Sequence, residues 1–249
     1  MLQPVSLKDP DFAAQVRDLA PDVIVVVAFR VLPPEVFRIP KIGSFNLHAS
    51  LLPKYRGAAP INWAIINGEK ETGVTTFLLQ EKVDRGSMVL QARIPIADDD
   101  DAGTIHDRLA EVGAEIVLQT VRLLEQDRAK PRVQDETKAS LAPKIFKENC
   151  RINWNRPAAG IRNLIRGLSP YPAAFTTHDG RVLKIYKATV LPSGATGPAG
   201  SVVVSRTSLT VATADAMLDI VELQQEGRKR MGIEEFLRGY RITTGAMLE

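Results

Sequence analysis

Hydrophobic and polar positions follow two different patterns along the chain, and the first pattern covers the N-terminal half. There, apolar runs of strand length stand between segments whose apolar positions recur with helical spacing. The run at 22–29, DVIVVVAF, is continuous and rich in β-branched residues, which fits a parallel strand buried on both faces. The same patterns predict further strands at 42–47, 74–80 and 88–96, and helices at 11–19, 60–67 and 104–125. This alternation predicts an α/β fold with a largely parallel sheet.

The second pattern begins after a break in periodicity. The stretch 128–147 is polar and aperiodic, so it predicts a linker that separates domains at 1–127 and 148–249. Short strands at near-regular spacing then favour a small β-barrel or sandwich. The predicted elements are a helix at 158–168 and strands at 174–177, 182–190, 201–204, 209–212 and 217–223.

Composition narrows the class of protein. Hydrophobic residues make up 45% of the chain and charged residues 24%, as in an ordinary globular protein. No apolar run approaches the roughly 18 to 20 residues that span a bilayer, so no membrane partner is expected. The single cysteine, Cys150, cannot form an internal disulfide, which fits a reducing cytoplasm. Its polar surroundings, KENCRINW, indicate a structural thiol and not a nucleophile.

Charge is distributed unevenly. Residues 1–137 contain 16 Lys and Arg against 20 Asp and Glu, a net of −4, whereas residues 138–249 contain 16 against 9, a net of +7. A basic C-terminal half is typical of a domain that meets a polyanion, although an ordinary solvated surface gives the same excess. The acidic run at 98–101 precedes the helix predicted at 104–125, and we interpret it as a solvated helix N-terminus, not a metal site.

Candidate chemistry is densest at 44–57, SFNLHASLLPKYRG. The two-residue period of a strand places Asn46 and His48 on one face, near the end of a buried strand. In open α/β sheets, the carboxyl ends of the strands form the ligand crevice. There, His48 can act as an acid or base and Asn46 can donate a hydrogen bond to an oxyanion. Asp84, in the loop VDRG, is the candidate carboxylate, although an aspartate in such a loop is more often a turn residue.

Two segments carry a resemblance to a known family. The run FNLHASLLPKYRGAAPINWAI resembles N-x-H-x-S-L-L-P-x-x-R-G-x-x-P, the signature of folate-dependent formyltransferases and hydrolases, and VDRGSM resembles their D-x-G loop. The Asn, His and Asp of the signature match Asn46, His48 and Asp84. The stretch that lines the folate site in the family matches Ser50, Leu51, Leu52 and Pro53. The C-terminal half is similar to methionyl-tRNA formyltransferases at KPRVQDET, RINW, SPYPAAF and GRKRMGIEEFLRG.

The resemblance implies formyl transfer from 10-formyltetrahydrofolate to the amino group of methionyl-tRNA, which makes the initiator for translation. Asn46 would bind the oxyanion, His48 would stabilise it and move the amine proton, and Asp84 would orient the imidazole and favour its charged form. No metal is implied. The expected partners are methionyl-initiator tRNA and folate, and the expected state is a monomer.

The resemblance also implies a partial Rossmann-like, parallel-sheet formyltransferase domain followed by a C-terminal OB-like β-barrel that holds tRNA. Arg228, Lys229 and Arg230 are the candidate phosphate contacts, with a solvated loop as the equal alternative. Family members carry several dozen further residues at the front, with the opening strands of the sheet and a G-T-P-x-F segment. The segment QPVSL, which follows those strands in relatives, stands at 3–7, as a late start codon or a truncated gene would produce.

Two alternatives remain open at the level of the sequence. One is a formyltetrahydrofolate hydrolase or another formyltransferase of the superfamily, and release of formate without an acceptor would identify the hydrolase. The other is a non-catalytic tRNA-binding module with a poorly folded front domain. A single unfolding transition assignable to 148–249 would identify that module.

Overall fold

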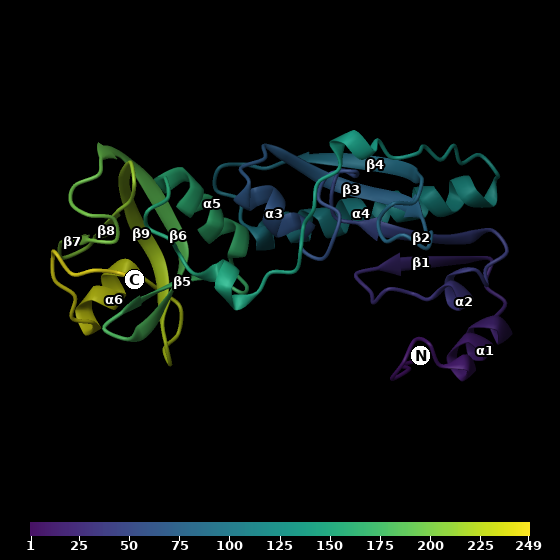
Figure 1. The fold of residues 1–249 in the computed structure, drawn as a ribbon, viewed down its shortest axis with the longest axis horizontal. Coiled ribbons are helices and arrows are strands. Elements are labelled where there is room, and N and C mark those ends of the chain that lie inside the picture. The colour runs from purple at the N-terminus through teal and green to yellow at the C-terminus, as the bar shows by residue number, and fades with distance from the viewer. The chain divides into compact units, whose positions relative to one another are not determined.

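Two β-sheets organise the chain (Figure 1). The computed structural model describes the backbone of residues 1–249 and the side chains of residues 1–192 and 194–249. The strands of the N-terminal sheet are β1 (Val23–Val27), β2 (Gly43–His48), β3 (Glu71–Leu78) and β4 (Met88–Pro95). The helices of this half are α1 (Pro10–Asp18), α2 (Pro34–Phe37), α3 (Pro60–Ile66) and α4 (Ala102–Glu125). The periodicity predicted all of these elements except α2, a single turn.

The N-terminal sheet is mixed, which corrects the largely parallel sheet that the strand–helix alternation predicted. In the order β1-β2-β3-β4, β1 and β2 run parallel, whereas β2 pairs antiparallel with β3 and β3 pairs antiparallel with β4. The loop between β3 and β4 contains no helix, and such a short connection reverses the direction of the chain. α3 stands between β2 and β3 in the sequence, but these two strands are antiparallel, so strand–helix alternation did not indicate a parallel pair here.

β1 is an edge strand within the described residues, since it pairs with β2 alone. Val26 is buried, but Val25 and Val27 are 38% and 51% exposed, and Phe29 just beyond the strand is 55% exposed. The expectation that this apolar run is buried on both faces is therefore wrong for the described residues. The helices α1 and α2 contribute to a small separate apolar cluster of Leu7, Phe12, Ala13, Val16 and Val36.

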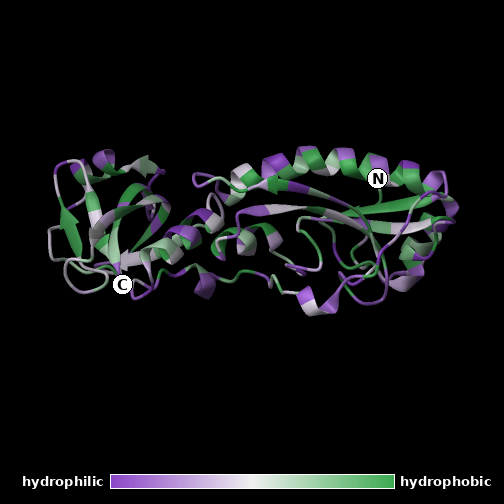
Figure 2. Ribbon diagram, turned by 90° about the horizontal axis from the view of Figure 1, so that it is seen from above, coloured by the Kyte–Doolittle hydropathy of each residue, from purple (hydrophilic) through white to green (hydrophobic). Residues whose placement is uncertain are grey.

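α4 covers one face of the N-terminal sheet. Apolar and polar bands alternate along this longest helix, as Figure 2 shows. Gly113 of α4 lies against the Leu47 side chain of β2, and the hydroxyls of Thr120 and Thr76 are hydrogen-bonded at 2.8 Å between α4 and β3. Leu47 and Thr76 are direct partners in the β2–β3 register. Side chains of that register position therefore point toward the helix.

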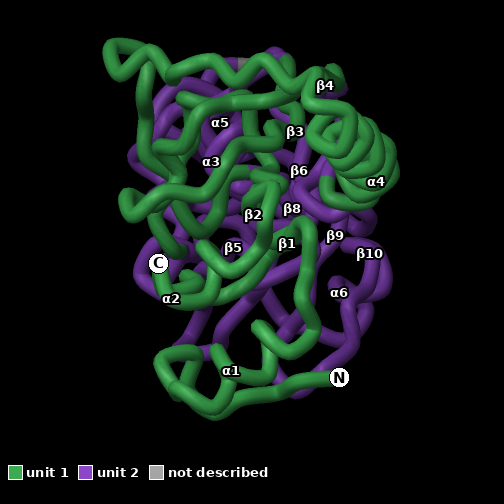
Figure 3. The backbone as a smooth tube through the Cα atoms, turned by 90° about the vertical axis from the view of Figure 1, so that its right-hand side faces the viewer, with its two compact units in different colours: residues 1–60, 71–95, 106–144 green, residues 61–70, 96–105, 145–249 purple. Residues whose placement is uncertain are grey.

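The chain separates into two compact units, each assembled from distant stretches of sequence (Figure 3). Unit 1 contains residues 1–60, 71–95 and 106–144, and unit 2 contains residues 61–70, 96–105 and 145–249. Most of the polar stretch that was predicted as a linker, 128–147, belongs to unit 1, which extends to residue 144. There, Arg132 exchanges two backbone hydrogen bonds of 2.8 Å with Met88 of β4.

Within unit 2, the acidic run at 98–101 is held by an arginine of α5 (Ala158–Leu168). Asp101 accepts a 2.9 Å hydrogen bond from the backbone N–H of Thr104 and so caps α4, which agrees with the interpretation of this run as a helix N-terminus. The carbonyl oxygens of Ala97 and Asp100 accept hydrogen bonds of 2.9 and 3.1 Å from Arg166, which is 8% exposed. Burial lowers the pKa of the Arg166 guanidinium. The run is thus a structural anchor as well as a helix N-terminus.

The second sheet is antiparallel throughout and has the order β5-β6-β9-β8-β7, with β10 on β9. β5 and β7 do not pair with each other in the described residues, so the strands alone do not close a barrel. The C-terminal segment reaches both edges: Glu249 exchanges two 2.9 Å hydrogen bonds with Thr177 of β5, and Val202 of β7 donates to Ala246 at 3.0 Å. The elements are β5 (Ala174–His178), β6 (Arg181–Gly194), β7 (Val202–Val204), β8 (Leu209–Ala212), β9 (Ala216–Gln225), β10 (Met231–Gly232) and α6 (Ile233–Gly239).

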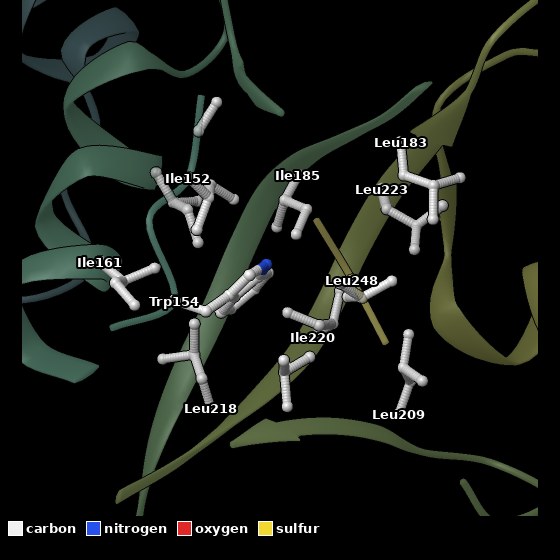
Figure 4. Packing of buried hydrophobic residues seen from close by; sticks show 14 of the residues in the cluster. Ile152, Trp154, Ile161, Leu183, Ile185, Leu209, Leu218, Ile220, Leu223 and Leu248 are labelled. Carbon is white, nitrogen blue, oxygen red and sulfur yellow. The ribbon is translucent and has the colours of Figure 1, made fainter. Parts of the chain in front are cut away.

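The core of unit 2 forms where α5 and the C-terminal segment meet this sheet. Side chains from all three gather around Trp154 (Figure 4). Ile161, Ile220 and Leu248 are among those buried there, at 1%, 0% and 4% exposure. Burying such a side chain contributes about 1.5–3 kcal/mol. The indole N–H of Trp154 donates to the Thr176 hydroxyl at 3.1 Å, so its polar atom is satisfied inside the core.

Candidate active site

β2 presents Asn46 and His48 on the face opposite to α4. In the register with β3, Asn46 pairs with Phe77 and His48 pairs with Thr75, whereas Leu47 between them points toward the helix. The imidazole of His48 meets the Phe77 ring edge-on, with 6.5 Å between the ring centroids. The period of two therefore brings the two candidate groups to one face, as the sequence predicts.

The imidazole of His48 is fixed by the backbone. The side chain is 7% exposed, and its Nε2 lies 2.8 Å from the carbonyl oxygen of Tyr55. A carbonyl oxygen only accepts hydrogen bonds, so Nε2 carries the proton in this contact. In the neutral ring, Nδ1 is then the basic nitrogen.

The amide of Asn46 is a free donor. The residue is half-buried, and no side-chain hydrogen bond to it occurs among the described residues. Its NH2 group can therefore donate a hydrogen bond to a reacting group that binds on the same face as the imidazole.

The loop after β2 folds back over this face and is held by its own buried groups. The Ser50 hydroxyl, fully buried, donates to the carbonyl of Lys54 at 2.7 Å. The Thr75 hydroxyl donates to the carbonyl of Ser50 at 2.7 Å and accepts from the N–H of Leu52 at 3.1 Å. Ser50 and Leu52, two of the four residues predicted to line a folate site, thus have side chains that stabilise the loop from inside.

Leu51 and Pro53, the other two predicted folate-lining residues, are partly exposed. The Leu51 side chain lies against Gly73 of β3, and the Pro53 carbonyl accepts from the N–H of Ser140 at 3.3 Å. A ligand can therefore reach this loop through Leu51, Pro53 and the backbone. The folate assignment itself stays a prediction.

Asp84 lies in a tight loop whose backbone is unusual. Its φ of 55° is in the left-handed region, which costs an L-residue roughly 1–2 kcal/mol. Its Oδ2 accepts a 3.0 Å hydrogen bond from the N–H of Gly57. A side chain at position 86 would place its Cβ 1.7 Å from the carbonyl oxygen of Leu78, so Gly86 is required by close approach to the end of β3. These constraints account for the D-x-G sequence of the loop.

His48 and Asp84 reach the same short segment from two sides. His48 binds the carbonyl of Tyr55, and Asp84 binds the N–H of Gly57, two residues later. Within the described residues there is no hydrogen bond between His48 and Asp84 themselves. Direct orientation of the imidazole by this carboxylate therefore stays a prediction.

Two buried polar side chains, one within this segment and one hydrogen-bonded to it, were not singled out by the sequence analysis. Arg56 and Gln134 are 6% and 4% exposed, and the Arg56 guanidinium donates to Gln134 and, bidentately, to Glu136. The hydrogen bond from Arg56 lowers the pKa of the Glu136 carboxyl. The available signal was the arginine of the S-L-L-P-x-x-R-G signature. Gln134 gave none, because it stands in a polar stretch that resembles a linker.

A cavity of about 710 Å³ lies at the other end of β2. It is lined by residues of 37–44 and 78–82, which include the first residues of β2 and the last residue of β3. His48 is the last residue of β2, so this cavity is separate from the candidate active site.

The three basic residues predicted to contact tRNA follow β9, and their surroundings differ. Arg230 donates twice to Glu222 at 2.6 Å, lies 4.4 Å from the ring centroid of Tyr186, and has a raised pKa because of the Glu222 contact. Lys229 forms an ion pair of 3.5 Å with a glutamate of α6. Arg228 is exposed and takes part in no ion pair of the described residues. Arg228 is therefore the most available of the three for a phosphate.

The remaining candidate side chains lie elsewhere. His106 is exposed beside Asp107, and Nδ1 of the buried His178 lies 2.9 Å from the Tyr240 hydroxyl. Cys150 is buried, and burial raises the pKa of its thiol.

In the part of the chain that the structure describes, no group of three or more His, Cys, Asp or Glu is placed to hold a metal ion. No helix of the described residues combines the length and apolarity needed to cross a bilayer.

Comparison with known families matches both halves of the chain. Residues 1–121 match the family described as "Formyl transferase", and residues 144–241 match "Formyl transferase, C-terminal domain". The methionyl-tRNA formyltransferase of Caldanaerobacter subterraneus subsp. tengcongensis is 49% identical over 100% of this chain and 81% of its own length. That of Chlorobium limicola is 52% identical over 93% of this chain and 74% of its own length.

Solved structures show the same fold at lower identity. HypX from Aquifex aeolicus, in complex with tetrahydrofolic acid, has a TM-score of 0.70 and 20% identity, covering 96% of this chain and 44% of that chain. WlaRD, a sugar 3N-formyl transferase, has a TM-score of 0.67 and 20% identity, covering 86% of this chain and 77% of that chain. At these identities, the likeness concerns the fold alone.

Proposed function

We infer the reaction of this chain from its family, because the chain belongs to the methionyl-tRNA formyltransferases. It is a transferase that moves a formyl group from 10-formyltetrahydrofolate to the amino group of methionyl-tRNA, which supplies the initiator N-formylmethionyl-tRNA for translation. The observation that carries this conclusion is the identity of 49% over the whole chain. The site we propose is the face of β2 that carries Asn46 and His48.

In the proposed reaction, the amine nitrogen attacks the formyl carbon and the carbonyl electrons move to oxygen, which gives a tetrahedral oxyanion. The free amide of Asn46 donates a hydrogen bond to that oxygen, a contact worth about 10²–10³ in rate. Nδ1 of His48 takes the proton of the attacking amine, a step worth about 10²–10⁴. The bond to N10 of the folate then breaks, and N10 takes up a proton. The 2.8 Å bond from Nε2 to the Tyr55 carbonyl supports this assignment of the ring nitrogens.

Asp84 is the proposed carboxylate of the site. Its negative charge favours the imidazolium that forms when His48 takes the proton. This effect needs proximity and not direct contact, since opposite charges attract through the intervening protein. The shared segment 55–57, which both side chains bind, supports a fixed separation between them.

The binding surfaces are also proposals. We assign folate to the loop at Ser50, Leu51, Leu52 and Pro53, where the partly exposed Leu51 and Pro53 offer apolar contact to a flat ring. We assign tRNA to the C-terminal sheet, with Arg228 as the first candidate contact. An OB-like barrel is supported by the C-terminal segment, which hydrogen-bonds to both β5 and β7.

The proposed organisation is a catalytic part at 1–127, a connecting segment at 128–147 and a tRNA-binding part at 148–249. The two family matches, at 1–121 and 144–241, support this division. The proposed oligomeric state is a monomer. The proposed compartment is the cytoplasm, since the substrate is an aminoacylated tRNA and the one cysteine needs no oxidising compartment.

The direct test is formylation of methionyl-tRNA by the purified 249-residue chain with 10-formyltetrahydrofolate, beside its His48→Ala variant. Activity that the variant lacks supports both the function and the site. Formate that appears without any acceptor would identify a hydrolase instead. Tight binding of tRNA without turnover would support a non-catalytic binding module.

A further inference from the structure

Gln134 is buried beside the candidate active site and uses every hydrogen-bonding position of its side chain. Its Nε2 donates to the carbonyl oxygens of Asp84 and Gly86 at 2.8 and 2.9 Å. Its Oε1 accepts from Nε and Nη2 of Arg56 at 3.0 and 2.7 Å. Carbonyl oxygens only accept and a guanidinium only donates, so the orientation of this amide is determined by its partners.

These contacts complete a closed circuit around the Asp84 loop. The side chain of Gln134 accepts a hydrogen bond from the side chain of Arg56. The next residue, Gly57, donates its backbone N–H to the Asp84 carboxylate at 3.0 Å. The Asp84 carbonyl in turn accepts a hydrogen bond from Gln134, which closes the circuit. The circuit fixes the backbone and the carboxylate of Asp84 together. Because Asp84 has a left-handed φ of 55°, its loop depends on such external contacts.

The same circuit includes the segment that holds the imidazole. Tyr55, whose carbonyl binds His48, directly precedes Arg56. A displacement of the Asp84 loop therefore moves the carboxylate relative to the ring, without any contact between Gln134 and a substrate. We propose that Gln134 is a positioning residue for formyl transfer, and that it acts by holding Asp84 at a fixed distance and direction from His48. This role rests on the proposed function of His48 and Asp84.

The test replaces Gln134 by glutamate, which keeps an acceptor for Arg56 but directs an oxygen at the carbonyls of Asp84 and Gly86. We expect the Gly57 amide, followed by hydrogen exchange with NMR detection, to exchange at least about tenfold faster. In the formylation assay, we expect kcat to fall at least about tenfold while KM for methionyl-tRNA stays within about threefold. Unchanged exchange at Gly57 would overturn the proposal.

Two further variants separate positioning from general destabilisation. The control is Glu136→Gln, which alters the other partner of Arg56 and the exposed 3.6 Å ion pair with Arg85, but keeps both hydrogen bonds from Gln134 to the Asp84 loop. In this variant, kcat and Gly57 exchange should therefore change far less than in Gln134→Glu. In an Asp84→Ala background, Gln134→Glu should cause no additional loss of kcat, because its effect passes through Asp84. An additional loss as large as in the parent chain would contradict the proposal.

The experiment separates a failure to fold, or a lack of activity in the parent chain, from a failure of the proposal. Should Gln134→Glu fail to fold, Gln134→Met supplies a side chain of similar length without the two donors, and the same exchange rates decide the question. Should the parent chain show no formylation, the proposed function fails for this chain, whereas the exchange of Gly57 still supports or overturns the positioning role.

Discussion

Nε2 of His48 lies 2.8 Å from the carbonyl oxygen of Tyr55, and this contact distinguishes the two nitrogens of the ring. The nitrogen that binds the carbonyl is protonated, so Nδ1 is left to accept a proton from a substrate. The burial of the ring means that the protein and not solvent sets its orientation. The imidazole is therefore already oriented before any substrate binds, and removing it should lower the rate by its full contribution to proton transfer.

Replacing His48 or Asp84 by alanine is therefore expected to reduce formylation at least about a hundredfold, since general acid–base work alone contributes about 10²–10⁴. The measurement is kcat/KM with methionyl-tRNA and 10-formyltetrahydrofolate. The matched control is His106→Ala, because His106 is exposed on α4 and its loss should leave the rate unchanged. A loss below about tenfold for both His48→Ala and Asp84→Ala would remove the assignment of the site.

The basic residues after β9 should divide into one tRNA contact and one structural residue. Arg228→Ala is expected to weaken tRNA binding and to reduce the slope of log affinity against log salt by about one, since one phosphate contact is lost. Arg230→Ala should instead lower the stability of unit 2, because its guanidinium is committed to Glu222 and the Tyr186 ring. Filter binding over a salt series, beside urea unfolding of each variant, measures both effects. Equal changes in salt slope for the two variants would contradict this division.

The core of unit 2 should respond to loss of a single side chain in proportion to burial. Leu218 is 0% exposed, so Leu218→Ala is expected to lower the free energy of unfolding by about 2–5 kcal/mol through lost burial and the cavity that remains. Val203, 43% exposed on the same sheet, provides the control, and Val203→Ala should change stability by no more than about 0.5 kcal/mol. Urea unfolding followed by tryptophan fluorescence, to which the buried Trp154 of this core contributes, reports both. Similar losses for the two variants would mean that this cluster is not the stabilising core.

Local periodicity predicted most elements of this fold because helix and strand spacing is a property of neighbouring residues. The helix at Ala158–Leu168 was predicted at the same residues that the structure shows. The prediction of a largely parallel sheet was wrong for β3, since the direction of a strand depends on pairing between segments far apart in sequence. The short helix Ile233–Gly239 was also missed, because its buried Ile233 and Phe236 derive their stability from contact with the rest of unit 2.

The site shows the same division between local and distant information. That Asn46 and His48 share a face followed from the period of a strand. The hydrogen bond between Gly57 and Asp84 joins residues 27 positions apart, and the one between Gln134 and the Asp84 carbonyl joins residues 50 positions apart. In an aperiodic stretch, the sequence pattern does not distinguish a polar residue that binds water from one that binds a buried loop. Gln134 was therefore read as part of a linker.

Asp219 of β9 provides a test of pH dependence away from the site. Its Oδ1 is buried and has no hydrogen-bond partner among the described residues, and burial raises the pKa of its carboxyl above the ordinary value of 3.8. The folded chain therefore binds this proton more tightly than the unfolded chain does. In the interval between the ordinary pKa and the raised one, the contribution of Asp219 to the free energy of unfolding must fall as pH rises.

Asp219→Asn removes that contribution. The stability of the variant relative to the parent chain should therefore increase as pH rises from about 3.5 to 7, and the increase should cease once the raised pKa has been passed. Urea unfolding of both proteins across this range gives the difference directly, and the titration of every other group cancels in it. Glu226→Gln, which removes the same charge at an exposed position, should show no comparable trend. A stability difference between Asp219→Asn and the parent that does not vary with pH would mean that the carboxyl is hydrated in solution and that its burial does not oppose ionisation.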